Sequence, residues 1–307
     1  MTAGAHVQPL ATSWQDRDAA AVSPVGLLQL PANATAHRLA RELGDDLVLG
    51  DIYDGGAGVY QALVDGDDSE ITLMTHRTRG LRGPVLDLGC GTGRLTMPFL
   101  ARGHQVVAVD RSDAMLTRLR DVAATFPMRM SASLETLYAD MAELPALDRL
   151  FDVVLLGTTT VTLLDGETRA RAFGGLIRLL TPGGKFLIST LWYDELQSSV
   201  PSTETARVLS VRDEDDRAVL VTVFEQVDQD AGVRHVSVLV AGPVGEPLRP
   251  ALFTTTPRLL PEELLRTELE TAGFAIEHRD LLAAHPDGRR VVLFTCLARN
   301  AGVEGRP

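Results

Sequence analysis

The stretch that decides the fold is VLDLGCGTG, residues 85–93, followed after a short helical pattern by VVAVD, residues 106–110. Each stretch begins with a short apolar run, interrupted in the first stretch by Asp87, and such runs are typical of strands buried on both faces of a parallel sheet. The first run leads into a turn with glycine at every second position, and the second ends in Asp110. A strand that enters a glycine turn and then a helix begins a βαβ unit, so this part of the chain predicts an α/β fold.

The same alternation continues beyond Asp110. Further strands are predicted near 130–138, 151–156 and 185–191, and helices are predicted over 94–102, 112–124 (with Ser112 as N-cap) and 167–180. Residues 181–184, TPGG, predict the turn before the strand at 185–191. A helix over 261–272 and strands near 274–279 and 290–297 complete the pattern. The prediction is a Rossmann-like fold with a mostly parallel seven-stranded sheet.

Residues 207–256 break this rhythm. Alternating or β-branched runs at 218–226, 233–241 and 251–256 are separated by the turn residues 228–232 and by Gly242-Pro243. They predict an inserted antiparallel β lid. The predicted organisation is therefore an N-terminal extension (1–40), a cofactor-binding core (41–206), a β lid for substrate (207–256) and the C-terminal part of the core sheet (257–300).

Composition limits the kinds of partner and compartment. The net charge of −12 argues against a nucleic-acid partner, which would require clustered Lys and Arg. The two cysteines, Cys90 and Cys296, indicate neither disulfides nor a zinc site, and the acidic runs at 65–68 and 213–216 lack metal-ligand spacing. The chain has no signal-peptide pattern and no apolar run of about 20 residues. We expect a cytoplasmic protein with no metal and no membrane partner.

The glycine turn and its flanking acids indicate the ligand. Gly89, Gly91 and Gly93 let the backbone approach a ligand closely, but their G-x-G-x-G spacing differs from the G-x-G-x-x-G of dinucleotide sites. Asp87, two residues before the first glycine, would lie poorly beside a pyrophosphate and well beside an ammonium group. Asp110 could accept hydrogen bonds from both ribose hydroxyls. The glycine spacing and Asp87 favour S-adenosylmethionine over NAD, whereas Asp110 does not discriminate between the two cofactors.

These segments together resemble the motifs of class I S-adenosylmethionine-dependent methyltransferases. Residues 85–93 resemble motif I, residues 110–116 (DRSDAML) the ribose motif and residues 138–141 (YADM) the third cofactor motif, while TPGG resembles the family's turn before strand five. The resemblance implies a cofactor site formed by Asp87, Gly89, Cys90, Gly91, Gly93, Asp110, Arg111, Met115, Asp140, Met141 and Gly157. A loop or cap role for Asp140 and plain core packing for Met141 remain alternatives.

The substrate side is predicted from segments around the same sheet edge. Thr158, Thr159 and Thr160 follow the strand at 151–156, and Trp192 with Tyr193 follows the strand at 185–191. Catalytic candidates are Tyr53 and Tyr60, in a segment resembling the aromatic segment of small-molecule N-methyltransferases, and His235 as a base in the lid. Packing of the aromatic side chains on the sheet is the alternative for the two tyrosines, and a surface or half-buried polar side chain is the alternative for His235.

The order of elements resembles that of amino-sugar N,N-dimethyltransferases and of enzymes that methylate the N-terminal amine of ribosomal peptides. It implies transfer of a methyl group to an amine of a natural-product intermediate, with a small-molecule or peptide substrate and a homodimer as a candidate assembly. Residues 157–164 lack the Asn-Pro-Pro-Tyr type of motif associated with nucleobase or glutamine methylation. An O-methyltransferase using His235, an NAD-dependent reductase and a non-catalytic cofactor-binding domain are the alternatives.

Overall fold

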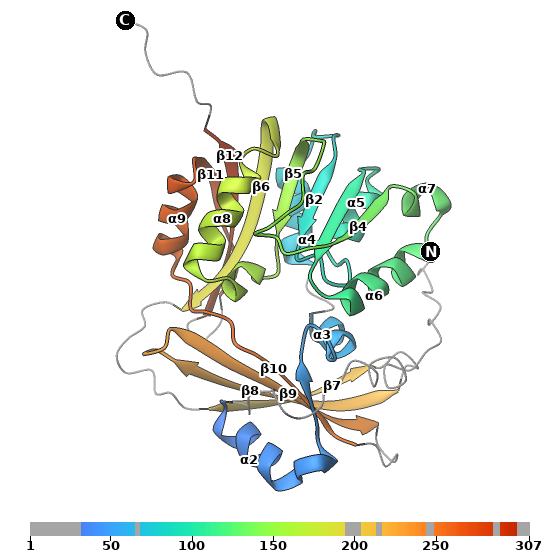
Figure 1. The fold of residues 1–307 in the computed structure, drawn as a ribbon, viewed down its shortest axis with the longest axis vertical. Coiled ribbons are helices and arrows are strands. Elements are labelled where there is room, and N and C mark those ends of the chain that lie inside the picture. Colours follow the sequence, from blue (N-terminus) through green and yellow to red (C-terminus); the bar gives the residue numbers. More distant parts are fainter. Residues whose placement is uncertain are drawn as a thin grey trace, which may run out of the picture. The chain divides into compact units, whose positions relative to one another are not determined.

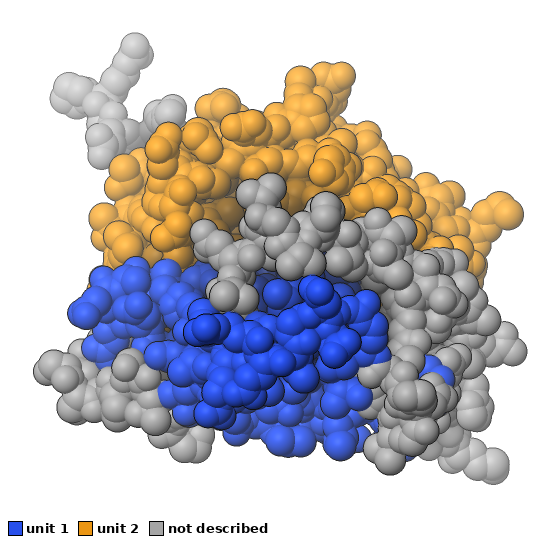
Figure 2. Space-filling model, turned by 60° about the horizontal axis from the view of Figure 1, so that its bottom comes forward, with its two compact units in different colours: residues 1–65, 201–256 blue, residues 66–200, 257–307 orange. Residues whose placement is uncertain are grey.

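The structure is a computed structural model, which describes residues 32–64, 68–193, 204–212, 217–243, 249–284 and 289–299. The chain divides into two compact units, shown in different colours in Figure 2. Residues 1–65 and 201–256 form one, here called the β unit; residues 66–200 and 257–307 form the other, the α/β unit. Each unit contains its own sheet and is described by itself.

The α/β unit is built on a seven-stranded sheet in the order β11-β12-β6-β5-β2-β3-β4 (Figure 1). Its strands are β2 (Val85–Leu88), β3 (Val106–Asp110), β4 (Leu134–Tyr138), β5 (Phe151–Leu156), β6 (Leu180–Tyr193), β11 (Phe274–Ala284) and β12 (Arg289–Ala298). Neighbouring strands from β6 to β4 are parallel, whereas β12 pairs antiparallel with both β6 and β11. The predicted mostly parallel seven-stranded sheet is confirmed.

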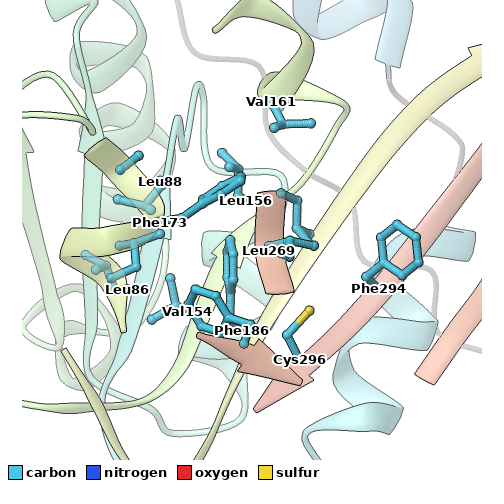
Figure 3. Close-up of a cluster of buried hydrophobic side chains, with 14 of the residues drawn as sticks. Leu86, Leu88, Val154, Leu156, Val161, Phe173, Phe186, Leu269, Phe294 and Cys296 are labelled. Carbon is cyan, nitrogen blue, oxygen red and sulfur yellow. The ribbon is translucent and has the colours of Figure 1, made fainter. Parts of the chain in front are cut away.

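Helices cover both faces of this sheet because successive strand residues point to opposite sides. Leu86, Val154 and their neighbours pack against α8 and α9, in the cluster that Figure 3 shows around Phe173, Phe186 and Leu269. Val85 and Val153, one residue earlier on each strand, pack instead against Met74 of α4 and Phe99 of α5. The helices are α4 (Ser69–Arg77), α5 (Thr96–Ala101), α6 (Asp113–Ala124), α7 (Met128–Ser131), α8 (Gly166–Leu176) and α9 (Glu262–Thr271), with the short 3-10 helix η2 (Thr160–Leu163).

Element ends follow local chemistry in some places and tertiary pairing in others. Ser112 caps α6 as predicted, since its hydroxyl accepts a hydrogen bond from the Met115 amide at 3.2 Å. The predicted helix 167–180 is too long, because α8 ends at Leu176 and Leu180 already pairs with Phe151 of β5. Residues 181–184 therefore lie within β6 as an irregularity, with Gly183 at φ 81°, rather than before the strand.

The β unit contains a five-stranded sheet in the order β1-β10-β9-β8-β7. Its elements are α2 (Ala34–Leu43), η1 (Gly44–Asp46), β1 (Val48–Asp51), α3 (Ala57–Val64), β7 (Thr205–Arg212), β8 (Ala218–Asp228), β9 (Val233–Pro243) and β10 (Ala251–Thr255). Strands β8, β9 and β10 correspond to the three predicted antiparallel runs, β7 is a further antiparallel strand, and β1 adds a parallel edge through pairs such as Val48 with Ala251. The structure thus groups residues 41–65 with the lid, whereas the sequence places them in the cofactor-binding core.

Over the ranges that the structure describes, no group of three or more His, Cys, Asp or Glu side chains could hold a metal ion. Among those same residues, no helix is both long and apolar enough to cross a bilayer.

Candidate cofactor site

The candidate site lies in the α/β unit, at the carboxyl ends of the adjacent strands β5, β2 and β3. In open α/β sheets ligands bind outside these strand ends, where loops meet the N-termini of helices. The glycine turn follows β2, Asp110 ends β3, and the threonine loop (residues 157–160) follows β5. The order of these three strands in the sheet therefore brings together segments that the sequence predicted separately.

The three glycines of the turn all have positive φ, at 61°, 54° and 97° for Gly89, Gly91 and Gly93. A Cβ on Gly89 would lie 2.7 Å from Thr160 Cγ2, and one on Gly93 would lie 2.4 Å from Leu119 Cδ1, so packing requires glycine at both. A Cβ on Gly91 would have as its nearest non-adjacent neighbour Met115 Sδ, at 3.9 Å. The turn thus leaves open space along the Gly91 backbone, which is the place a ligand could approach closely.

Asp110 is fixed by backbone amides. One oxygen accepts from the Gly91 N–H at 2.8 Å, and the other accepts from the Ser112 N–H at 2.9 Å. Burial raises the pKa of the carboxyl, and the hydrogen bonds from Ser112 and Gly91 oppose that increase. Each oxygen of a carboxylate can accept a second hydrogen bond. Asp110 can therefore bind a ribose diol while holding the glycine turn against β3.

Asp87 is more deeply buried than its predicted role requires. It is 1% exposed, and one carboxylate oxygen accepts from the Thr96 hydroxyl, in the first turn of α5, at 2.6 Å. Burial raises its pKa to about 7, and the nearby charge of Asp110 adds to the increase. The geometry makes Asp87 a support that ties β2 to α5 beneath the glycine turn. Asp87 would therefore attract an ammonium group electrostatically, across the glycine turn and without direct contact.

The threonine loop contains a strained backbone. Thr158 and Thr159 have φ of 53° and 58°, a left-handed conformation that costs a non-glycine residue on the order of 1 kcal/mol. The Thr159 N–H donates to the buried Ser189 hydroxyl at 3.1 Å, and the Thr162 hydroxyl donates to the Thr159 carbonyl at 2.8 Å. Strain of this kind is concentrated at functional sites. The predicted substrate segment 158–160 therefore has an unusual, well-supported geometry.

The remaining cofactor candidates surround the turn with different exposures. Asp140 is exposed, and its carboxylate accepts from the Ala142 N–H at 2.8 Å, forming a turn of its own loop. Met141 is half-buried, and its Cε lies 3.3 Å from where a Cβ on Gly89 would be. Cys90 is buried with a thiol pKa well above its ordinary value because of desolvation, and Arg111 is exposed. Met141 is thus the member of this group that directly meets the glycine turn.

The aromatic pair after β6 is engaged within the sheet. Trp192 is half-buried against the main core, and the Arg279 guanidinium lies 5.7 Å from the centre of its ring. Tyr193 pairs with Arg289 at the end of β6, and its side chain lies outside the described atoms. The cation that the structure places over Trp192 is therefore Arg279.

The three catalytic candidates belong to the β unit. Tyr53 and Tyr60 make an edge-to-face contact with ring centres 5.2 Å apart, and both pack on the apolar cluster that contains Ile52 and Phe253. His235 lies on β9 opposite Gln226, and its carbonyl accepts from the Asn33 side chain at 2.9 Å. Each residue has a packing or pairing role in its own sheet, and their catalytic roles stay predictions.

Comparison with known proteins agrees with this geometry. Residues 85–184 match a family model described as a methyltransferase domain. The chain is 25% identical over 249 residues to a putative methyltransferase, YqeM, of Bacillus subtilis, covering 79% of this chain and 95% of that protein. It is 30% identical over 169 residues to the cypemycin N-terminal methyltransferase of a Streptomyces species (55% and 63%), and 32% identical over 139 residues to a malonyl-[acyl-carrier protein] O-methyltransferase of Salmonella typhimurium (45% and 48%).

Solved structures share the architecture. The glycopeptide N-methyltransferase MtfA in complex with S-adenosylhomocysteine is 25% identical, covering 85% of this chain and 97% of that one with a TM-score of 0.55. The amino pentose methyltransferase CalS10 from Micromonospora echinaspora, with S-adenosylmethionine bound, is 21% identical over 77% of this chain and 94% of that one, with a TM-score of 0.58. The fold is therefore that of the class I methyltransferases.

Residues 85–184 of this chain form a methyltransferase domain, and the solved structures that share its architecture are S-adenosylmethionine-dependent methyltransferases. The predicted fold, enzyme class and methyl donor are confirmed, and the reductase and non-catalytic alternatives are set aside. When bound, the cofactor supplies an electrophilic methyl group on a sulfonium, and the open space at Gly91 beside the Asp110 carboxylate suits its nucleoside part.

Proposed function

We propose that this enzyme transfers the methyl group to an amine of a natural-product substrate, either an amino sugar or a peptide N-terminus. The observation that carries the proposal is that none of the described histidines of the α/β unit lies on the strand ends or loops that form the candidate site. His104 precedes β3 and contacts the Gly83 carbonyl, at the end of the sheet opposite the glycine turn. His76 lies in the last turn of α4, and His278 lies on the edge strand β11.

An amine acceptor fits a site in which no histidine is positioned as a base. A neutral amine attacks the methyl carbon without a positioned base, whereas an alcohol or phenol requires a group to take its proton. The protein then has to align the amine with the sulfonium methyl and keep water out. We assign the alignment to the strained loop Thr158–Thr160, and the recognition of the ribose to Asp110.

The proposal gives the other predicted residues supporting roles. Gly91 lets the backbone lie against the cofactor, Asp87 supplies negative field for the methionine ammonium, and Asp140 with Met141 binds the adenine. The names of the cypemycin and glycopeptide relatives, both N-methyltransferases, favour an amine acceptor. A homodimer and a cytoplasmic location stay predictions.

O-methylation is the second candidate, because a relative at 32% identity is an O-methyltransferase, although the chain spans about half the length of that protein. In this alternative His235 of the β unit would take the proton from the hydroxyl. The two candidates make different demands on one side chain. His235→Ala should leave amine methylation within about threefold of the wild type and should reduce hydroxyl methylation on the order of a hundredfold or more.

The experiment is transfer of tritiated methyl from S-adenosylmethionine to a panel of amino sugars, peptides with a free N-terminus, the same peptides with an acetylated N-terminus, and phenols. The expected result is label on free amines and none on the acetylated peptides. Label on phenols alone, lost in His235→Ala, would refute the amine proposal. The acetylated peptides are the matched control, because they differ from their partners at one nitrogen.

A further inference from the structure

A buried carboxylate on α4 joins the two loops of the site. Glu70 lies in the first turn of α4, ahead of the first core strand, and is 6% exposed. Its Oε1 accepts from the Thr158 N–H at 2.9 Å, and its Oε2 forms an ion pair with Arg94 Nη2. Carboxylates are buried to this extent only when they are paired. Both oxygens of Glu70 are used on the loops that follow β2 and β5.

Arg94 closes the arrangement from the side of the glycine turn. It follows Gly93 directly in the sequence, and the same Nη2 that meets Glu70 also donates to the Thr158 hydroxyl at 2.9 Å. Thr158 is therefore held at its amide by Glu70 and at its hydroxyl by Arg94. We call these three residues the Glu70 cluster.

The cluster holds the most strained backbone of the site. Thr158 and Thr159 are both left-handed, and such a conformation persists only where the surroundings over-determine it. A Cβ on Gly157 would lie 3.0 Å from Glu70 Oε1, so the carboxylate packs directly on the backbone where β5 ends. The Thr159 amide, next along, is held by Ser189 of β6. Helix α4 and strand β6 thus hold two successive peptide N–H groups, and Arg94 holds the Thr158 side chain between them.

We infer that Glu70 is a positioning residue for methyl transfer, acting through Arg94 and Thr158 to lock the threonine loop to the glycine turn. As a consequence, the distance between the glycine turn on the cofactor side and the threonine loop on the acceptor side stays fixed. Rates of reactions between bound groups fall on the order of a hundredfold for a misplacement of about 1 Å. The inference rests on the proposed function in one respect, that the threonine loop aligns the acceptor.

The competing explanation is that Glu70 contributes stability alone, as buried ion pairs do when one partner is removed. The chain provides a matched control. Glu268 of α9 forms a two-point pair with the buried Arg169 of α8, at 2.6 and 2.7 Å. Glu268→Gln removes the same charge from the same kind of pair, within the same unit, but from two helices that do not carry the glycine turn.

The test compares E70Q, E268Q, T158G and the double variant E70Q/T158G in the full chain. Hydrogen exchange of peptides covering residues 157–162 and calorimetry are both performed with S-adenosylhomocysteine, and thermal unfolding measures stability. E70Q and E268Q should lower the unfolding temperature by similar amounts. E70Q alone should speed exchange of the loop about tenfold and weaken S-adenosylhomocysteine binding about tenfold, the loss expected for a hydrogen bond to a charged group.

Glycine at position 158 separates positioning from stability. Glycine adopts a φ near 53° without strain, so in the T158G background E70Q should cost less than about threefold in affinity. Loop exchange in E70Q equal to that in E268Q, or an equal cost of E70Q in both backgrounds, would overturn the inference. Neither readout needs a methyl acceptor. Failure of the amine proposal therefore leaves this result standing, and failure here leaves the amine proposal standing.

Discussion

Replacing the buried acid beneath the glycine turn should make the protein more stable at high pH and a weaker binder of its cofactor. Asp87 is 1% exposed, and its carboxylate accepts one hydrogen bond from the Thr96 hydroxyl. Burial, the largest cause, and the charge of Asp110 raise its pKa from 3.8 to about 7. Above that pH the folded protein carries a charge with little solvation.

Proton linkage gives the direction and the size of the change in stability with pH that Asp87 causes. Because the folded pKa is raised, the folded state binds the proton more tightly than the unfolded state, and its stability is greatest below pH 3.8. Stability is then lost as the pH rises through 7. The full loss is about 4 kcal/mol for a shift of this size, and about 2 kcal/mol of it falls between pH 5.5 and 8.5.

Asp87→Asn keeps an oxygen for the Thr96 hydroxyl and removes the charge. Relative to the wild type, its free energy of unfolding should therefore rise by about 2 kcal/mol between pH 5.5 and 8.5. Urea unfolding followed by circular dichroism at four or five pH values measures this difference. Asp113→Asn, which removes an exposed carboxylate of α6, is the control and should show a constant difference.

Calorimetry at pH 8 completes the experiment, because the neutral amide of the Asp87→Asn variant supplies no negative field for the methionine ammonium and binding should weaken. Parallel stability curves for Asp87→Asn and the wild type would refute the assignment of the pKa to burial. Unchanged affinity for S-adenosylmethionine would refute the electrostatic role of Asp87. A variant that gains stability while losing affinity is the outcome expected of a charge kept for binding.

Three further predictions concern the same unit. Asp110→Ala should weaken S-adenosylmethionine binding by about tenfold or more in calorimetry, because hydrogen bonds to a charged acceptor are lost; equal affinity would contradict the ribose assignment. Gly91→Val should abolish binding by filling the open space beside the turn, whereas Gly103→Val, also at positive φ with open space, should cost stability and keep binding; similar affinities in both would argue against backbone approach at Gly91. Burial raises the thiol pKa of Cys90 and Cys296, so iodoacetamide at pH 8 should label them only after urea unfolding, and rapid labelling of the native protein would contradict their burial.

Much of the α/β unit could be predicted because its signals are local. The runs at 85–88, 106–109 and 151–156 are apolar except for Asp87 and Asp152, and each forms a strand buried by helices on both faces. The cap at Ser112 depends on a hydroxyl that accepts a hydrogen bond from an amide three residues further along the chain. Such features depend on neighbours in the chain, so periodicity and residue type are enough to find them.

Elements that depend on distant partners were predicted poorly. β1 has four residues and no marked pattern, and it exists as a strand because Val48 pairs with Ala251 in the β unit. The end of α8 was misplaced because Leu180 pairs with Phe151, which the helical pattern of the segment does not reveal. In both cases the hydrogen bonds of the backbone are completed by another part of the chain.

The same division holds for the site. The sequence by itself determined the methyl donor, since the glycine spacing and the acid two residues before the first glycine are local properties of one strand end. Only the tertiary structure decided that Asp87 points toward Thr96 of α5, and that Thr158 is left-handed and held by Glu70, 88 residues away. Periodicity shows which face of an element a residue occupies. The role of a buried charge depends on its partner, and the packing of the whole unit determines which residue that partner is.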